Sequence, residues 1–342
     1  MLLSPIKWKN KKIIFIDQTK LPSKLKYVTC KDIDRLCDAI KRLEIRGAPL
    51  IGVSVALGYA LGALNSKKKT VKGLSQDLAI ASRKLKNTRP TAINLFWALD
   101  RMQSSFIKFS KSLGDIKNIK KGIVKEAINI LEEDRLICKK IGRHGAKLIK
   151  NGDIILTHCN AGMLATAGFG TALSIFYEAK RQGKCFKVYA DETRPLMQGS
   201  RLTVWELMKN NIDVTLICDD MAASTIRDKK ITKVITGADR IARNGDSANK
   251  IGTYGVAILA KHHNIPFYIA APTSTIDRTI KTGKDIPIEG RKKEELIYVG
   301  NKQTAPVNSK VYNPAFDVTP NKLIRAIITE KGIYDIKRFR RI

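Results

Sequence analysis

Residues 151–170, with the sequence NGDIILTHCNAGMLATAGFG, are the stretch that decides the fold. Within it, Ile154–Thr157 is a short apolar run between polar and glycine residues, which predicts a buried strand over 153–158. A glycine-containing turn follows, and then a helical pattern over 164–180. Strand, turn and helix in this order form the first half of a parallel βαβ unit, in which the carboxyl end of the strand faces the ligand crevice. Cys159 stands at that end.

The chain after this stretch repeats the same rhythm of strand, loop and helix. We expect strands over 186–190, 213–218, 232–236 and 266–271, and helices over 199–210, 220–227 and 252–263. This alternation predicts a Rossmann-like α/β fold, with a parallel sheet and helices on both of its faces. A further strand at Tyr298-Val299 and a helix over 321–331 complete the predicted C-terminal part.

The chain before residue 151 has a mostly helical pattern. Short strands are expected at 12–18 and 27–29, followed by helices over 31–43, 50–65, 76–86, 92–109 and 121–150, with a basic loop at 67–75. Apolar residues recur in these helical segments at the three-and-four spacing of a buried helix face. We therefore predict a smaller, mostly helical N-terminal domain over 1–120 and a Rossmann-like catalytic domain over 121–342, with the long helix 121–150 as connector.

The composition excludes several classes of protein. Of the 342 residues, 44% are hydrophobic, which is ample for a packed core and argues against disorder. We expect no membrane span, because no uninterrupted apolar run reaches about 18 residues, and the start MLLSPIKWKNKK lacks a signal-peptide core. The six scattered cysteines form no CxxC pair, so neither a zinc site nor a disulfide framework is predicted. These features favour a cytoplasmic protein.

The net charge of +32, from 63 basic and 31 acidic residues, has two interpretations. A nucleic-acid binder would carry such a charge, and so would a protein with a lysine-rich, solvated surface. The lysines are spread over the whole length, and neither a zinc-finger spacing nor an RNA-binding aromatic motif accompanies them. We favour the solvated surface, which would also attract an anionic substrate such as a sugar phosphate. Nucleic acid is therefore not an expected partner.

Polar side chains follow the expected strands of the C-terminal part. They are His158-Cys159-Asn160, Asp191-Glu192-Thr193-Arg194, Asp219-Asp220, Asp239-Arg240 and Thr273-Ser274-Thr275. The carboxyl ends of parallel strands lie along one edge of a sheet, where ligands bind. A cysteine and several carboxylates at that edge predict a site for acid–base chemistry.

Each of these residues also has a purely structural interpretation. Cysteine is often a small buried residue, and only the polar neighbours of Cys159 favour a catalytic role. Asp239 follows a Gly-Ala pair, where aspartate commonly caps a turn. His158 has no second histidine at ligand spacing, so we expect a structural histidine and no metal site. Neither a GxGxxG turn nor a GxxxxGK[ST] loop occurs, so no nucleotide cofactor is expected.

Six motifs give the sequence a family resemblance. They are Arg46-Gly47-Ala48-Pro49, the segments 89–95 and 157–166, the segment 192–203 (ETRPLMQGSRLT), Gly237-Ala238-Asp239-Arg240-Ile241 and Asn249-Lys250-Ile251-Gly252-Thr253. In this order they resemble the methylthioribose-1-phosphate isomerase family, from about residue 10 to 335. That family belongs to a superfamily with the regulatory subunits of translation initiation factor 2B.

The resemblance implies an aldose–ketose isomerase that converts 5-methylthioribose 1-phosphate to 5-methylthioribulose 1-phosphate, a step of methionine salvage. Cys159 matches the family's catalytic cysteine and Asp239 its catalytic acid. The matches to its substrate contacts are Arg46, Gly47, Ala48, Arg89, Gln198, Asn249 and Lys250. The family forms homodimers, so the resemblance implies a homodimer, and we expect the reaction to require neither a cofactor nor a metal.

These residue types suit the reaction. The phosphate on C1 prevents free opening of the sugar ring, so an acid must protonate the ring oxygen, and this requires a raised pKa at Asp239. Hydrogen then moves from C2 to C1, either through a thiolate base at Cys159 or as a hydride that Cys159 only helps to orient. Arg46, Arg89 and Lys250 are expected to hold the phosphate, helped by the helix start after Gly47. We therefore predict a site in the cleft between the two domains.

Two other functions remain open from the sequence. One is an isomerase of another 1-phosphorylated pentose, such as ribose 1,5-bisphosphate or 5-deoxyribose 1-phosphate, because the residues around C5 of the sugar are not assignable. The other is a non-catalytic regulatory subunit of the translation-factor branch, against which the presence of both Cys159 and Asp239 argues.

Overall fold

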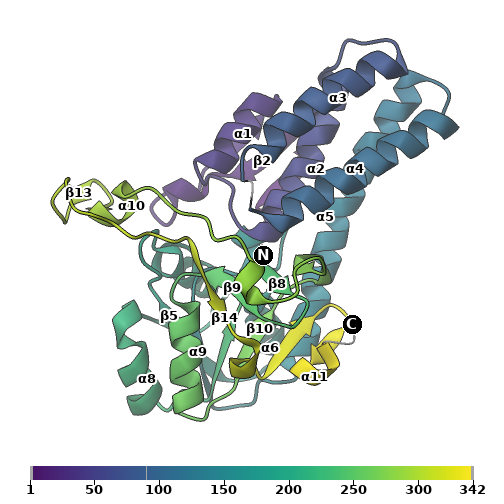
Figure 1. Cartoon of the computed structure of the whole chain (residues 1–342). Helices are drawn as coiled ribbons and strands as arrows, with labels where there is room; N and C mark the ends of the chain where they lie inside the picture. Colours follow the sequence, from purple (N-terminus) through teal and green to yellow (C-terminus); the bar gives the residue numbers. More distant parts are fainter. Residues whose placement is uncertain (1–2, 90, 340–342) are drawn as a thin grey trace. The chain divides into compact units, whose positions relative to one another are not determined.

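Figure 1 shows the computed structural model, which describes residues 3–89 and 91–339. The chain forms two compact units. The N-terminal unit comprises the chain up to Lys139 together with the segment Gly162–Gly170, and the C-terminal unit comprises Lys140–Ala161 and the chain from Thr171 onward. The chain therefore leaves the C-terminal unit shortly after Cys159 and returns to it at Thr171.

The N-terminal unit combines a three-stranded antiparallel sheet, in the order β1-β2-β3, with a group of helices. Its strands are β1 (Ile6–Lys9), β2 (Lys12–Ile16) and β3 (Tyr27–Cys30), and a 3-10 helix covers Gln18–Lys20. Its helices are α1 (Ile33–Lys41), α2 (Ala48–Asn65), α3 (Val71–Lys86), α4 (Ile93–Ser112) and most of α5 (Ile116–Ala146). The mostly helical character and the small β element agree with the prediction.

Helix α2 is the centre of the N-terminal core. The expectation that no apolar run reaches about 18 residues is wrong here, because this 18-residue helix could cross a membrane by length and composition alone. However, 78% of it is buried in the structure, as in the core helix of a globular unit. Its glycines allow the neighbouring helices to approach closely. A Cβ at Gly58 would lie 2.5 Å from Leu36 of α1, and one at Gly52 would lie 2.9 Å from the Asn94 carbonyl oxygen at the start of α4.

Helix α5 crosses the boundary between the units. They divide at Lys139–Lys140, whereas the sequence predicts a division near residue 120. The reason is that the first half of α5 packs into the N-terminal core, through Ile119, Ile123, Ala127, Ile130 and Leu131. The predicted helix 121–150 begins earlier, at Ile116, and ends at Ala146.

Helix α3 shortens the loop that the sequence predicts over 67–75. The helix begins at Val71, because the Thr70 hydroxyl accepts a hydrogen bond of 3.1 Å from the Gly73 amide and caps the helix. The basic residues before Thr70 remain outside regular structure.

The C-terminal unit is built on a seven-stranded sheet in the order β16-β15-β10-β7-β4-β5-β6. The strands are β4 (Asp153–Thr157), β5 (Phe186–Asp191), β6 (Val214–Ile217), β7 (Lys233–Thr236), β10 (Phe267–Ala270), β15 (Ala326–Thr329) and β16 (Gly332–Tyr334). The helices are α6 (Ala172–Arg181), the π-helical turn Gly199–Thr203, α7 (Val204–Lys209), α8 (Ala222–Asp228), α9 (Thr253–His262), α10 (Glu294–Ile297) and α11 (Ile336–Phe339). All strands except β16 are parallel, which confirms the predicted α/β fold.

The strand order reverses between β4 and β7. From β4 the chain adds β5 and β6 on one side, and then crosses to add β7, β10 and β15 on the other. At such a reversal the connections leave the two central strands towards opposite faces, and a crevice opens at their carboxyl ends. Leu156 pairs with Val234, so the strands end in step, and the Thr157 hydroxyl donates a hydrogen bond of 2.8 Å to the Ile235 carbonyl.

Helices cover both faces of this sheet. On one face Phe186 of β5 meets Phe176 of α6, with ring centroids 6.0 Å apart. Phe186 pairs with Asp153, so Leu156, three residues along β4, points to the opposite face. There Leu156 and Val234 share an apolar cluster with residues of α8 and α9. Figure 1 shows α9 in front of the sheet.

The prediction of a helix over 321–331 is wrong. The segment forms a 3-10 turn at Asn321–Leu323 and then strand β15, which pairs with β10 from Tyr268 and Ala326 onward. All four residues of β15 are buried, because both faces of the sheet are covered. An apolar run of this kind lacks the alternation of a half-exposed strand and cannot be distinguished from a buried helix by its period.

Two further segments differ from the prediction. The connection from β7 to α9 contributes to a second sheet, in the order β11-β8-β9-β14, whose strands are β8 (Arg240–Ala242), β9 (Ser247–Lys250), β11 (Ile276–Asp277) and β14 (Phe316–Thr319). The expected strand at Tyr298-Val299 is β12, which pairs only with β13 (Lys302–Gln303). The helix predicted over 164–180 begins at Ala172, after a 3-10 turn at Met163–Ala165.

The segment Gly162–Gly170 is fixed to α5 by a buried carboxylate. The Ala167 amide donates a hydrogen bond of 2.7 Å to Asp134, and the Cys138 thiol donates to the same oxygen over 3.9 Å. Burial raises the pKa of Asp134 to about 6, although the bond from Ala167 opposes this change. The folded state therefore holds a proton on Asp134 more tightly than the unfolded chain does.

This shift predicts a pH-dependent stability. A raised carboxyl pKa stabilises the fold fully below the unfolded value near 4, and this contribution is lost as the pH rises through about 6. Asp134→Asn keeps the acceptor for Ala167 but does not titrate. From pH 4.5 to 7.5 the wild type should lose about 2 kcal/mol of unfolding free energy relative to this variant in urea titrations. A constant difference across this range would contradict the assignment.

Candidate active site

The reversal between β4 and β7 places Cys159 and Asp239 at neighbouring strand ends. Cys159 is the second residue after β4, and Asp239 the third residue after β7. The sequence predicted both residues as catalytic, and the sheet order gives them the position where doubly wound sheets bind ligands.

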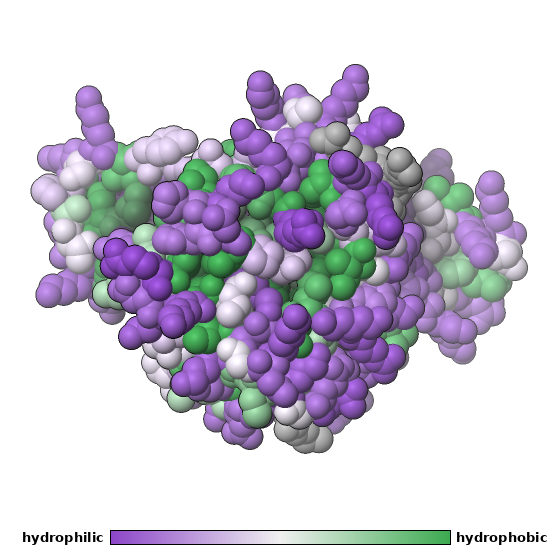
Figure 2. Space-filling model, turned by 90° about the horizontal axis from the view of Figure 1, so that it is seen from below, coloured by the Kyte–Doolittle hydropathy of each residue, from purple (hydrophilic) through white to green (hydrophobic). Residues whose placement is uncertain are grey.

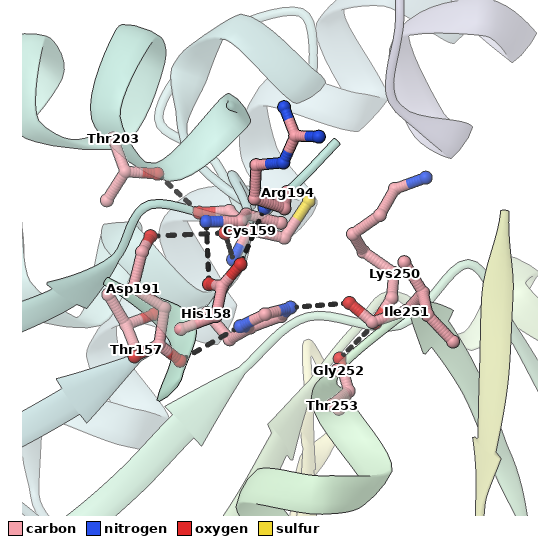
Figure 3. Close-up of polar contacts among 12 residues, drawn as sticks. Thr157, His158, Cys159, Asp191, Arg194, Thr203, Lys250, Ile251, Gly252 and Thr253 are labelled. Carbon is pink, nitrogen blue, oxygen red and sulfur yellow. Dashed lines mark hydrogen bonds and ion pairs between the residues drawn. The ribbon is translucent and has the colours of Figure 1, made fainter. Parts of the chain in front are cut away.

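Cys159 has an unusual backbone conformation that hydrogen bonds hold in place. Its φ angle is +63°, in the left-handed region that non-glycine residues rarely adopt outside functional or tightly constrained positions. Its amide donates to the Thr193 hydroxyl over 2.9 Å, and its carbonyl accepts from the Thr203 hydroxyl over 2.6 Å. The residue is only 9% exposed. The backbone from which the thiol projects is thus held by two threonine hydroxyls, one of which, Thr203, is labelled in Figure 3.

A buried polar network continues from Cys159 into the interior. The Asn160 amide donates to Thr203 over 3.2 Å and to the Glu206 carboxylate over 2.9 Å. The Tyr177 hydroxyl donates to the other oxygen of Glu206 over 2.8 Å. Burial and the neighbouring Glu206 carboxylate raise the pKa of Tyr177 well above its usual value, so it remains a donor. The network fixes the residue that follows Cys159.

His158 links three loops at the edge of the sheet. Its Nδ1 lies 2.9 Å from the Asp191 carboxylate and its Nε2 lies 2.8 Å from the Ile251 carbonyl, so both nitrogens face acceptors (Figure 3). Burial lowers the pKa of His158, but the hydrogen bond and charge of Asp191 outweigh it and raise the pKa overall. The two acceptors that face the ring favour an imidazole that is protonated on both nitrogens. It also contacts the backbone of Gly252, where a Cβ would lie 2.8 Å from the ring.

The same cluster has the composition of a metal site, and most but not all of its ligand atoms are hydrogen-bonded: the Oδ1 of Asp191 is buried without a partner among the described residues. Ligand atoms of His158, Asp191 and Asp219 all lie within 4.8 Å of one another. However, the two oxygens of Asp219 accept the amides of Thr193 and Arg194, over 2.8 and 2.6 Å. With both nitrogens of His158 also engaged, the cluster is a hydrogen-bond network that orders the strand ends. The hydrogen bonds of His158 support the structural role that the sequence led us to expect, which stays a prediction.

Asp239 lies between the two sheets of the C-terminal unit. Its amide donates to the Ala248 carbonyl over 2.9 Å, which ties the end of β7 to β9. The residue is half-buried. Its neighbour Arg240 pairs with Asp277 over 3.4 Å, so this arginine faces a carboxylate of β11.

The structure brings the other predicted residues of the C-terminal unit to the same edge. Gln198 follows β5, and Asn249 and Lys250 end β9. All three are at most 7% exposed. The Lys250 amine donates to the Ala315 carbonyl over 2.7 Å, and the Asn249 amide donates to Thr253 over 3.0 Å. The Oε1 atom of Gln198 is buried and has no hydrogen-bond donor within the described part of the chain.

The remaining predicted residues belong to the N-terminal unit. Gly47 is the N-cap of α2, with a φ angle of +93°, and Ala48 is its first residue, which confirms the predicted helix start after Gly47. Arg89 precedes α4, and its carbonyl accepts from the Ala92 amide over 3.1 Å. The starts of α2 and α4 are neighbours, because Gly52 contacts Asn94. Arg46 and Arg89 therefore precede two adjacent helix starts.

The segment that follows Cys159 packs against this part of the N-terminal unit. A Cβ at Gly47 would lie 2.6 Å from the backbone of Ala165, so only glycine permits this approach. The Gln18 amide also donates to the Leu164 carbonyl over 2.7 Å. Both contacts lie within the N-terminal unit, to which the segment Gly162–Gly170 belongs.

The opposite edge of the sheet carries none of these residues. A hollow of about 1180 Å³ there is lined by the starts of β10 and β15 and by α11, and one of about 410 Å³ by the starts of β4, β5 and β6. Figure 2, which views the molecule from below, shows hydrophilic side chains over most of the visible surface, with hydrophobic patches between them. The predicted catalytic residues are confined to the carboxyl ends of the strands.

Sequence reasoning did not assign several residues that shape the site. Thr193, Thr203 and Glu206 hold the backbone around Cys159, and Asp191 holds His158. Asp191 and Thr193 were identifiable as strand-end residues. Thr203 and Glu206 lie in the turn and helix that follow, where nothing in the local pattern indicates an inward-facing contact.

Comparisons with known proteins are consistent with this geometry. The model of the initiation factor 2 subunit family matches residues 44–336. A protein of Thermosipho africanus called methylthioribose-1-phosphate isomerase is 54% identical over 328 residues, which cover 96% of this chain and 94% of the relative.

Two solved structures are also similar over the full length. The 5-methylthioribose 1-phosphate isomerase of Pyrococcus horikoshii has a TM-score of 0.91 and 43% identity, covering 99% of this chain and 94% of that one. A protein described as translation initiation factor eIF-2B, subunit delta, from A. fulgidus has a TM-score of 0.87 and 46% identity, covering 99% of this chain and all of that one.

The His158–Asp191 pair gives a testable prediction. His158→Phe leaves a buried carboxylate without its cation, which should cost about 3–5 kcal/mol of unfolding free energy at pH 8. The loss should be smaller at pH 5, because the isolated carboxyl can then bind a proton. Urea titrations of His158→Phe and of His158→Phe/Asp191→Asn measure the effect. The double variant should recover much of the loss at pH 8, and equal stability of both variants would refute the ion pair.

Proposed function

This chain belongs to the initiation factor 2 subunit family, and we propose that it is a methylthioribose-1-phosphate isomerase. The proposed reaction converts 5-methylthioribose 1-phosphate to 5-methylthioribulose 1-phosphate. The observation that carries the proposal is the position of Cys159 and Asp239 at the ends of β4 and β7, where the strand order reverses. Relatives that are about half identical over nearly the whole chain carry the name of this enzyme.

Asp239 has the role of the acid in this proposal. The phosphate ester on C1 holds the sugar ring closed, so the ring oxygen must be protonated as its bond to C1 breaks. A carboxylic acid can supply that proton at neutral pH only if its pKa is raised, which a water-poor environment achieves by penalising the charged form. The half-buried position of Asp239 supports this role, and substrate binding would exclude further water.

Cys159 acts on the hydrogen that moves from C2 to C1. In a cis-enediol route its thiolate removes the C2 proton, and in a hydride route the thiol orients the sugar without taking a proton. Both routes need a thiol in a fixed direction, and the hydrogen bonds to Thr193 and Thr203 support that requirement. Conversion in D₂O distinguishes the routes, because only proton exchange with solvent places deuterium on C1.

The substrate contacts are part of the same proposal. Arg46 and Arg89 would bind phosphate oxygens, and the amides at Gly47 and Ala48 would add the donors of a helix start. In the C-terminal unit Gln198, Asn249 and Lys250 would bind the sugar and its phosphate. The buried Oε1 of Gln198, which no described residue satisfies, supports a donor from the substrate, such as a sugar hydroxyl.

The cellular location, the oligomeric state and the cofactor requirement of the enzyme are also proposals. We infer that it works in the cytoplasm as a homodimer, without cofactor or metal. The exposed apolar residues of the C-terminal unit include Met208, Leu216 and Met221, which lie near one another in sequence and would suit a subunit contact. The mass in solution, measured by light scattering, tests the dimer.

A regulatory subunit of a translation factor is the alternative within the family. The A. fulgidus structure with 46% identity is described as translation initiation factor eIF-2B, subunit delta. We favour the enzyme because this chain has the cysteine and the aspartate that the chemistry requires, both at the ligand edge of the sheet.

Turnover of the sugar phosphate is the direct test. The purified protein should convert methylthioribose 1-phosphate to the ketose, followed by ¹³C NMR, and should convert ribose 1,5-bisphosphate and 5-deoxyribose 1-phosphate more slowly. Absence of turnover of the first compound by a folded protein would exclude the proposed reaction. Preference for one of the others would move the assignment to that substrate.

The two catalytic assignments have their own variants. Cys159→Ser and Asp239→Asn should each lower kcat by about 100-fold or more, the usual size of an acid–base contribution. Asp213→Asn, an exposed carboxylate before β6 at the opposite edge of the sheet, serves as a control and should stay within about twofold of the wild type. Near-full activity of Asp239→Asn would show that another group is the acid.

A further inference from the structure

The loop after β5 carries Arg194, a charged residue that has no role in the proposed reaction as described. Thr193 has a φ angle of +65°, and the amides of Thr193 and Arg194 both donate to Asp219, over 2.8 and 2.6 Å. These bonds fix the direction in which the backbone presents the Arg194 side chain. The backbone at Arg194 is thus held by hydrogen bonds, as the backbone of Cys159 is.

The guanidinium of Arg194 is only partly satisfied. Its Nη2 donates to the Leu296 carbonyl over 3.2 Å. Its Nη1 is buried, and no acceptor for it exists among residues 3–89 and 91–339. A guanidinium keeps its charge in proteins, and a buried charged donor without an acceptor is costly. Such an atom indicates a position where a ligand supplies the acceptor.

Arg194 stands directly beside the catalytic cysteine. The Cys159 amide donates a hydrogen bond to the hydroxyl of Thr193, the residue before Arg194. Figure 3 shows the Arg194 guanidinium, the Cys159 thiol and the Lys250 amine extending towards the same side of the strand ends. Two cationic groups therefore flank the thiol in that view, one from the loop after β5 and one from β9.

Gln198, four residues further along the same loop, also has a buried polar atom without a hydrogen-bond partner among the described residues. The Oε1 of Gln198 is buried and lacks a donor, as the Nη1 of Arg194 lacks an acceptor. A sugar phosphate satisfies both, because it offers anionic oxygens to the guanidinium and hydroxyl groups to the amide oxygen. Guanidinium groups bind phosphate through two parallel hydrogen bonds and are strongest where water is excluded.

We propose that Arg194 is a substrate-binding residue whose Nη1 donates to an anionic phosphate oxygen of the sugar 1-phosphate bound beside Cys159. This inference deepens the proposed function and rests on it for the identity of the sugar. Arg194 then holds the phosphate on the side of the thiol, next to the carbons between which hydrogen moves. The bond to Leu296 keeps the guanidinium plane in position when the site is empty.

A binding measurement tests this role separately from catalysis. Asp239→Asn, confirmed to be inactive by NMR, is titrated calorimetrically with methylthioribose 1-phosphate. Arg194→Gln, Arg194→Lys and Arg227→Gln are then added singly to this parent. Arg227 is an exposed arginine of α8 paired with Asp228, so its loss removes the same charge from a site outside the binding machinery. Thermal unfolding of each variant reports whether the fold is intact.

Arg194→Gln should weaken binding about 10–100-fold, the usual effect of losing a hydrogen bond to a charged group. Arg194→Lys should lose less, because it keeps the charge but not the planar fork. Arg227→Gln should stay within about twofold of the parent. Unchanged affinity in both Arg194 variants, an equal loss in Arg227→Gln, or no binding by the parent would overturn the proposal.

The role of Arg194 and the proposed reaction are tested by different measurements, so their failures can be distinguished. Turnover by the wild-type protein is measured in parallel, and its absence would count against the isomerase while the binding series still judges Arg194. If Arg194→Gln unfolds, Arg194→Lys, which keeps a donor for the Leu296 carbonyl, decides the matter. A purely structural role predicts a lower midpoint of thermal unfolding with unchanged affinity for the folded variants.

Discussion

The pairing of β4 with β7 is the constraint on which the rest of the site depends. Through this pairing two strands whose connections lead in opposite directions become neighbours, and their ends stay in step because Leu156 pairs with Val234. Cys159 and Asp239 come from distant parts of the chain and share no contact that local sequence could specify. Sheet order places them at neighbouring strand ends, as the proposed action of a thiol and a carboxyl on one sugar requires.

Around this constraint, hydrogen bonds from later elements set the direction of each group. The left-handed conformation of Cys159 is unfavourable for a residue with a Cβ, and the two threonine hydroxyls offset that cost. His158, buried beside Asp191, ties the turn after β9 to the same edge. The strand ends thus form one connected polar network. The buried atoms without a partner among the described residues at this edge include the Nη1 of Arg194 and the Oε1 of Gln198, for which the proposed sugar phosphate would supply an acceptor and a donor.

Much of this arrangement could be predicted from the sequence, and the failures have physical reasons. The strands before Cys159 and Asp239 are short apolar runs followed by polar residues, so both strand ends were placed correctly. The buried run of β15 was predicted as a helix, because a strand covered on both faces loses its alternation. All four residues of β9 (Ser247–Lys250) are buried although none is strongly apolar except Ala248, so no hydrophobic pattern indicated a strand. Arg194 belongs to a sequence motif, but only the three-dimensional structure shows that its Nη1 is buried without an acceptor among the described residues.

The central claim is that Cys159 and Asp239 face one sugar phosphate at the reversal of the strand order. A crystal structure of the Asp239→Asn variant with methylthioribose 1-phosphate tests it most directly. The account predicts that C1 and C2 of the sugar lie within about 4 Å of the Cys159 sulfur and that the ring oxygen lies within hydrogen-bond distance of residue 239. A sugar phosphate bound elsewhere, such as in a hollow at the amino ends of the strands, would contradict it.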